Sequence, residues 1–185
     1  MEEQLKQQPA RCKRIVLYGP ESTGKTTLAQ KLAEHYDAPW VAEFAREYLQ
    51  EKWDKEQKIC EPHDLLPIAV GQMKLENDAA AKSDDFIFCD TNLLTTKVYS
   101  EAYYNGWCDP LLEKFALKNQ YDVYFLLYID TPWEEDDLRD RPDQREEMFA
   151  AFKNALEENN KPYILLDGDL ETRLRKAINH INQLN

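Results

Sequence analysis

Residues 19–26 carry the most specific chemical signal in this chain. They read GPESTGKT and fit the pattern G-x-x-x-x-G-K-[ST] between a predicted strand and a predicted helix. In such a loop the glycines let successive backbone amides point at phosphate oxygens, and the lysine reaches the β and γ phosphates. Thr26 would offer its hydroxyl to Mg²⁺. We therefore expect a P-loop that binds ATP and Mg²⁺, the alternative being an ordinary glycine turn ahead of a helix. The residues concerned are Gly19, Pro20, Glu21, Ser22, Thr23, Gly24, Lys25 and Thr26.

Two carboxylates lie at the carboxyl ends of predicted strands, as this loop does. Asp90 comes directly after the apolar run FIFC, where P-loop proteins keep a second Mg²⁺-organising carboxylate, although it could simply cap the next helix. Glu43 follows residues 40–42 in the same manner. It could take a proton from an acceptor hydroxyl, or it could be a solvated acidic residue in a first helical turn. We favour Glu43 over Asp90 as the catalytic base.

A charge-dense segment, residues 131–147, contains Arg139, Arg141 and Arg145. A guanidinium suits a γ-phosphate because its planar fork bonds two oxygens and stays charged. In small P-loop kinases such a segment is a mobile lid that closes over ATP and excludes water. The segment is therefore predicted to be an arginine-containing lid, the alternative being a surface helix whose charges pair internally.

Four aromatic residues are candidates for the wall of a pocket. They are Trp40, near the predicted second strand, and Tyr103, Tyr104 and Trp107, in the stretch SEAYYNGWCDP. Because flat rings stack well between aromatic side chains, these residues could line a pocket for the phosphoryl acceptor. Membership of the core is the alternative for each of them.

The elements that must position these residues alternate between strand and helix. Strands are predicted over Lys13–Tyr18 and residues 40–42, 86–89, 123–129 and 163–166. Helices are predicted over residues 26–36, 43–53, 64–83, 93–103, 110–119, 143–158 and 170–184. This alternation predicts an α/β fold with a parallel sheet, helices on both faces, and ligands bound at the carboxyl ends of the strands.

Composition bounds the function. The 185 residues suggest one domain over residues 1–185, with residues 1–12 as a polar lead. A net charge of -12 argues against nucleic acid as a partner. The apolar run 123–129 is too short to cross a bilayer and the amino terminus has no secretory signal, so no membrane partner and a cytoplasmic location are expected. The cysteines and histidines show no metal-ligand spacing.

Four stretches in order resemble one known family. They are GPESTGKTTL, EFAREYL from Glu43, CDTNLLTT from Cys89, and YDVYFLLYIDTPWEEDDLRD from Tyr121. From about residue 13 onward, the chain resembles the ribosylnicotinamide kinase domain of NadR-type proteins. The resemblance implies a P-loop kinase fold of the nucleoside and nucleotide kinase kind. It also implies that the γ-phosphate of ATP is transferred to the ribose 5′-hydroxyl of nicotinamide riboside, which forms nicotinamide mononucleotide in NAD salvage.

The resemblance further implies roles for individual residues. It extends the ATP- and Mg²⁺-binding residues to Thr27. It implies that Asp137, Arg139 and nearby arginines belong to the lid. It also implies that Tyr103 lines the pocket and that four residues face the riboside, namely Glu43, Arg46, Asp90 and Thr91.

The chain departs from the family at two points. The family keeps a stacking tryptophan directly before the Glu of the second-strand motif, where this chain has Ala42 with Trp40 two residues earlier. We therefore expect Trp40 or Tyr103 to provide the stacking surface. The amino-terminal adenylyltransferase sequence of NadR-type proteins is missing, so we do not expect this chain to make NAD itself. Kinase activity on another nucleoside or small alcohol, or a regulatory ATPase switch, remains an alternative.

Overall fold

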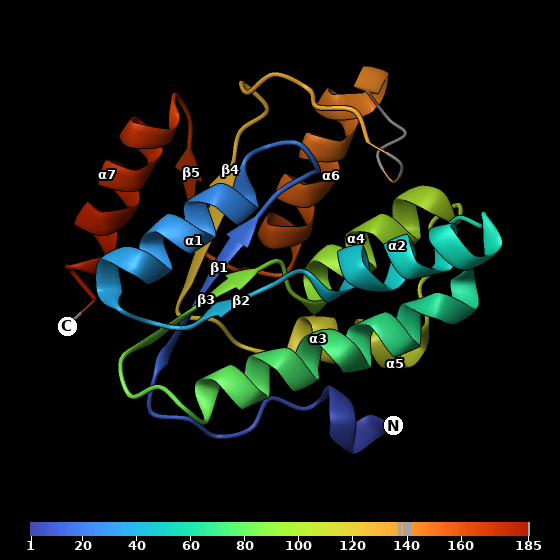
Figure 1. The fold of residues 1–185 in the computed structure, drawn as a ribbon, viewed down its shortest axis with the longest axis horizontal. Helices are drawn as coiled ribbons and strands as arrows, with labels where there is room; N and C mark the ends of the chain where they lie inside the picture. The colour runs from blue at the N-terminus through green and yellow to red at the C-terminus, as the bar shows by residue number, and fades with distance from the viewer. Residues whose placement is uncertain (137, 139–141, 185) are drawn as a thin grey trace.

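The centre of the molecule is a five-stranded parallel sheet (Figure 1). The computed structural model describes residues 1–136, 138 and 142–184. The strands are β1 (Lys13–Tyr18), β2 (Trp40–Val41), β3 (Phe86–Asp90), β4 (Val123–Leu127) and β5 (Tyr163–Leu166). Their order is β2-β3-β1-β4-β5, and every neighbouring pair is parallel. The predicted parallel α/β architecture is confirmed.

Helices follow the strands as the sequence pattern predicts. They are α1 (Lys25–Tyr36), α2 (Phe44–Glu56), α3 (Leu65–Ala80), α4 (Leu93–Tyr103), α5 (Pro110–Lys118), α6 (Arg145–Glu158) and α7 (Leu170–Ile181). Asn92, Asp109 and Asp169 each cap the helix that follows by accepting a hydrogen bond from a backbone N–H in its first turn. None of the helices in the described part of the chain is long and apolar enough to cross a membrane.

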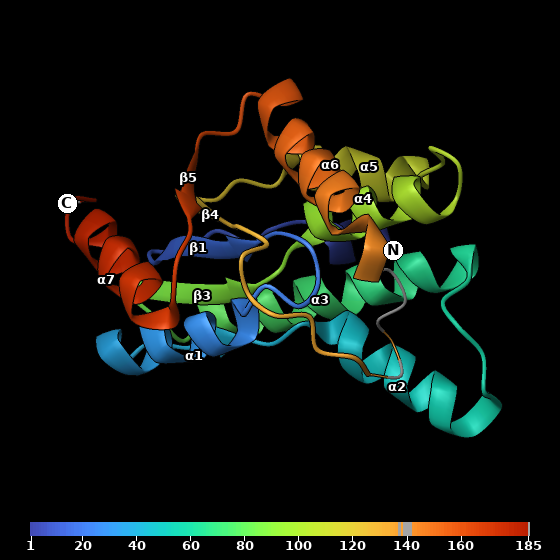
Figure 2. The ribbon, with the colours of Figure 1, turned by 90° about the horizontal axis from the view of Figure 1, so that it is seen from above.

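The two faces of the sheet are buried under different helices. Along β1, Ile15 and Leu17 pack with α1 and α7, whereas Val16 and Tyr18 pack with α4 and α6. Successive side chains of a strand point to opposite faces, so one apolar strand supplies both layers of the core. Figures 1 and 2 show α1 and α7 on one side of the sheet and α4 and α6 on the other.

The polar amino-terminal segment contributes one side chain to the core, which the sequence did not predict. Glu2–Leu5 forms a 3-10 helix, and the Leu5 side chain is fully buried among α3, α4 and α5. The Leu5 carbonyl accepts a hydrogen bond from Asn119 Nδ2 at 3.3 Å. The prediction missed this contact because one leucine among polar residues gives no periodic signal.

The register of the strands sets the place of the site. Leu17 of β1 lies opposite Asp90 of β3 on one side and Phe125 of β4 on the other. Because the strands are parallel, the chain leaves all three at the same edge of the sheet. The loop that begins at Gly19, the carboxylate of Asp90 and the segment after β4 therefore meet there.

Candidate functional site

The loop between β1 and α1 has the geometry of a phosphate cradle. Gly19 has φ 140°, and a Cβ at this position would lie 3.0 Å from the carbonyl oxygen of Leu127, so a side chain does not fit. Gly24 adopts a left-handed conformation with φ 82° directly before α1. The buried side chain of Lys25 folds back, and its Nζ donates to the carbonyl of Pro20 at 2.8 Å. The loop thus presents the amino terminus of α1 to the edge of the sheet.

A cavity of about 460 Å³ opens beside this loop. One end is lined by loop residues from Glu21 to Thr27, and the other by side chains of α2, α3 and α4. Thr131, Pro132, Glu134 and Leu138 contribute a further wall. A volume of this order suits a small organic ligand, and the cavity joins a phosphate-binding loop to a partly apolar chamber.

Asp90 contacts the loop through one of its two carboxylate oxygens. Its Oδ2 accepts a hydrogen bond from Thr26 Oγ1 at 2.5 Å. Its Oδ1 is buried and has no hydrogen-bond partner among the residues that the structure describes. Burial raises the pKa of Asp90, while the Lys25 ammonium and the Thr26 hydroxyl oppose that shift. A hydroxyl next to an under-coordinated carboxylate oxygen is a donor set that Mg²⁺ accepts, so these residues fit the ion.

Thr91 turns the chain sharply after β3. Its φ is 76°, a left-handed conformation that is unfavourable for a β-branched residue. Its N–H donates to the Leu17 carbonyl at 3.2 Å, and its side chain is buried outside the described lining of the cavity. Asp90 is likewise outside the described lining, but its hydrogen bond to Thr26 places it at the phosphate loop.

Glu43 and Arg46 lie at the start of α2, on the wall of the cavity. The position of this helix start is fixed by Gln72 of α3, which sequence reasoning missed. Gln72 is 2% exposed; its Oε1 accepts from the Phe44 N–H at 2.8 Å, and its Nε2 donates to the Ala42 carbonyl at 3.2 Å. These bonds bracket Glu43, whose side chain makes no capping hydrogen bond to α2. The sequence signal that could have identified Gln72 was its polar side chain next to Met73 on an otherwise apolar helix face.

Tyrosines of α4 and the segment after it form the far wall. Tyr103 and Tyr104 line the cavity, as does Tyr99, one helical turn before Tyr103. The rings of Tyr99 and Tyr103 lie 6.2 Å apart. Tyr104 donates its hydroxyl to the carbonyl of Cys60 at 2.9 Å, which holds the loop before α3 against the cavity. Tyr99 could have been found from its i, i-4 spacing to Tyr103.

The structure does not bring the two candidate tryptophans to the cavity. Trp40 is 37% exposed on β2 and pairs with Phe88, whose side chain belongs to the α1 and α7 face. Paired residues of parallel strands point to the same face, so Trp40 faces away from the α2 to α4 side. Trp107 is 44% exposed and is likewise outside the described lining. The expectation that these two residues line the pocket is corrected.

The candidate lid residues of the 131–147 segment divide into two groups. Asp137, Arg139 and Arg141 lie outside the described residues. Arg145 is described, and its guanidinium donates to the carbonyls of Thr131 at 2.7 Å and Ser22 at 3.0 Å. Arg145 thus contacts the backbone of the phosphate loop and is outside the described lining of the cavity.

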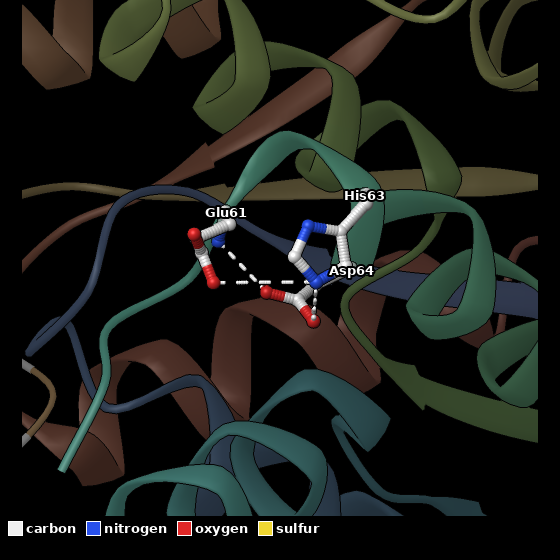
Figure 3. A group of neighbouring side chains, drawn as sticks. All are labelled: Glu61, His63 and Asp64. Carbon is white, nitrogen blue, oxygen red and sulfur yellow. Dashed lines mark hydrogen bonds and ion pairs between the residues drawn. The ribbon is translucent and has the colours of Figure 1, made fainter. Parts of the chain in front are cut away.

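A second group of charged side chains lies at the 3-10 helix that precedes α3, Pro62–Asp64 (Figure 3). Ligand-type atoms of Glu61, His63 and Asp64 all lie within 4.8 Å of one another. Lys52 Nζ already lies 2.8 Å from Glu61 Oε2 and 2.6 Å from Asp64 Oδ2, and Asp64 also accepts from the Tyr48 hydroxyl at 3.0 Å. An ammonium therefore compensates the carboxylates, and the cluster fastens α2 to the start of α3.

The parallel sheet and the loop at its carboxyl edge define a P-loop nucleotide-binding domain of the nucleoside and nucleotide kinase type. A family model described as an AAA domain, AAA_28, matches residues 14–173, and the chain belongs to this family.

The similar proteins include NadR proteins and other P-loop kinases. The trifunctional NAD biosynthesis/regulator protein NadR of Escherichia coli (strain K12) is 25% identical over 173 residues, which cover 92% of this chain and 42% of that protein. A crystal structure of a NadR protein in complex with NR has a TM-score of 0.78 at 26% identity and covers 94% of this chain and 52% of that one. A deoxyadenosine kinase from M. mycoides shares the fold with a TM-score of 0.65 at 15% identity, over 91% of this chain and 98% of that one.

The chain therefore spans about half or less of the NadR proteins that it matches. The resemblance to the kinase domain of NadR-type proteins that the motifs indicated is confirmed, as is the P-loop kinase fold.

Proposed function

We propose that this protein is an ATP- and Mg²⁺-dependent kinase that phosphorylates the 5′-hydroxyl of nicotinamide riboside and forms nicotinamide mononucleotide. The observation that carries the proposal is the single cavity that joins the phosphate loop to Glu43 and the tyrosine wall. One of the similar NadR structures holds NR, which we take to be nicotinamide riboside, and this supports the choice of acceptor.

The donor end of the cavity would hold the phosphates of ATP. The loop amides and Lys25 would bind the β and γ phosphates, and Lys25 would exchange its hydrogen bond to the Pro20 carbonyl for phosphate oxygens. Thr26 and Asp90 would hold Mg²⁺, with Asp90 using its free Oδ1. The ion, when bound, offsets negative charge on the phosphates in the transition state.

The acceptor end would orient the riboside. The rings of Tyr99 and Tyr103 would offer flat surfaces to the nicotinamide, and Glu43 lines the same cavity. The 5′-oxygen attacks the γ-phosphorus, the bond from that phosphorus to the bridging oxygen breaks, ADP leaves, and the hydroxyl proton passes to the Glu43 carboxylate. We assign the base to Glu43 because Asp90 is already engaged with Thr26.

The 131–147 segment would close over ATP. Asp137, Arg139 and Arg141 belong to this proposal by their sequence positions, since they lie outside the described residues. The guanidinium groups of Arg139 and Arg141 would offset charge that develops on the equatorial oxygens of the transferred group.

Two comparisons test the proposal. The parent protein is expected to add one phosphoryl group to nicotinamide riboside, detected by mass spectrometry, and none to a 5′-deoxy analogue. Because phosphoryl transfer has a loose transition state, Lys25→Ala is expected to lower kcat/KM more than Glu43→Gln does. Phosphorylation of the 5′-deoxy analogue contradicts the proposed position, and a larger loss in Glu43→Gln contradicts the assignment of roles.

A further inference from the structure

We infer that Arg173 of α7 is a positioning residue for the phosphate loop, holding the loop amides toward the nucleotide. Arg173 is 2% exposed. Its Nη1 donates to the carbonyl of Thr23 at 2.6 Å, and its Nη2 donates to the carbonyl of Tyr128 at 3.0 Å. Nη2 also forms an ion pair with Asp130. One buried guanidinium therefore joins the loop to the chain that leaves β4.

The planarity of the peptide bond explains how a hydrogen bond to the Thr23 carbonyl can orient the N–H on the opposite side of the same peptide. The carbonyl of Thr23 and the N–H of Gly24 belong to one peptide plane and point in opposite directions. When Arg173 fixes that carbonyl away from the cavity, the Gly24 N–H is turned toward the side where the phosphates would lie. A fixed amide binds an anion without first paying the entropy of being ordered.

The preceding peptide plane is held in the same way. The Ser22 carbonyl accepts from Arg145 Nη2 at 3.0 Å and from Thr131 Oγ1 at 2.8 Å, so the Thr23 N–H is also oriented. Ser22 itself has φ 57°, a left-handed conformation that needs support from its surroundings. Two consecutive loop carbonyls are thus each bound by an arginine from a different helix.

Asp130 completes the arrangement around Arg173. Its Oδ1 pairs with the guanidinium, and its Oδ2 accepts from the Gly168 N–H at 2.6 Å, just before α7. The buried cation is therefore compensated, and the phosphate loop, the chain that leaves β4 and the start of α7 are linked through these contacts. Arg173 therefore contacts the phosphate loop directly through the Thr23 carbonyl, in addition to joining α7 to the chain that leaves β4.

This inference rests on the nucleotide-binding half of the proposed function and not on the identity of the acceptor. Its test is the affinity for ATP and ADP, measured by calorimetry on folded protein, together with the separate KM values for ATP and acceptor. Arg173→Met is expected to weaken ATP and ADP about tenfold or more, the size of a lost charge-assisted hydrogen bond. The acceptor KM is expected to change by less than about twofold.

Two further variants separate positioning from folding. Arg173→Lys keeps the charge, but one ammonium lacks the fork that reaches both carbonyls, so its affinity should lie between parent and Arg173→Met. Arg175→Met, an exposed position on the same helix, should bind as the parent does.

The possible results are distinguishable. Parent-like ATP affinity in folded Arg173→Met, or an equal rise of both KM values, overturns the inference and leaves the proposed function standing. A parent protein that binds neither ATP nor ADP overturns both.

Discussion

Replacing Gly71 of α3 with alanine is expected to destabilise the protein, although the same change usually stabilises a helix. A Cβ at this position would lie 2.1 Å from Phe44 Cε1 and within 2.4 Å of two more atoms of the ring. Carbon atoms in contact are about 3.5 Å apart, so the ring would have to move by about 1.4 Å. Phe44 is the first residue of α2, and its N–H is bound by the neighbouring Gln72.

The magnitude follows from two opposing effects. Gly to Ala inside a helix contributes about 1 kcal/mol of stability, and forcing a ring out of a packed position costs about 1 to 3 kcal/mol. The Gln72 bond keeps the Phe44 backbone from yielding, so we place the cost near the upper end of its range. Gly71→Ala should therefore lower the free energy of unfolding by about 1 to 2 kcal/mol. Because α2 also lines the cavity, the KM of the acceptor should rise more than the KM of ATP.

Urea unfolding of a double-mutant cycle tests this reasoning. The cycle compares the parent, Gly71→Ala, Phe44→Ala and the double variant. Without the Phe44 ring, Gly71→Ala is expected to stabilise the protein by about 1 kcal/mol, as in an ordinary helix. The reasoning is refuted if Gly71→Ala stabilises the protein while the Phe44 ring is present.

Three further changes have definite expected outcomes. Although burial acts to raise it, the pKa of Asp64 is lowered by its hydrogen bonds to Lys52 and to backbone. The contribution of Asp64 to the free energy of unfolding is therefore complete above the ordinary pKa of about 4, and it is lost as the pH falls through the pKa of the folded state. Asp64→Asn should cost about 2 kcal/mol in urea unfolding at pH 7 and nothing at strongly acidic pH, and a pH-independent cost contradicts this. Leu5→Ala should cost about 2 to 4 kcal/mol because the side chain is fully buried, and a loss below about 0.5 kcal/mol contradicts the packed amino terminus. Trp40→Ala should leave the acceptor KM within about twofold while Tyr103→Ala raises it, and the reverse order contradicts the placement of the cavity.

Hydrophobic pattern was sufficient to predict the regular elements. Apolar runs such as residues 86–89 predicted strands, and helical spacing, as in residues 170–184, predicted helices; the structure has both within a few residues. Burial on both faces of a parallel sheet gives continuous apolar runs, which are easy to recognise. The 3-10 helix at Glu2–Leu5 was missed because its single buried side chain makes no pattern.

The motif predicted the place of Lys25 and Thr26 in the loop between β1 and α1, and the apolar run before Asp90 predicted that this carboxylate lies at the same edge of the sheet. Their chemical roles stay predictions. The site could not be predicted where the role depends on tertiary contact. Arg173 lies on the apolar stripe that includes Ala177, and a lone cation on such a stripe is the signal that was overlooked. Trp40 was misplaced because the sequence does not say which face of an edge strand meets the cavity.

The most direct test is ADP release from ATP and Mg²⁺ in the presence of nicotinamide riboside and of a panel of ordinary ribo- and deoxynucleosides. Lys25→Ala serves as the blank, because loss of its ammonium should abolish transfer to any acceptor. Strong stimulation by nicotinamide riboside alone is the predicted result. Stimulation by a different nucleoside would keep the kinase mechanism and contradict the substrate, whereas ATP hydrolysis that no acceptor stimulates would contradict the kinase and favour a regulatory ATPase.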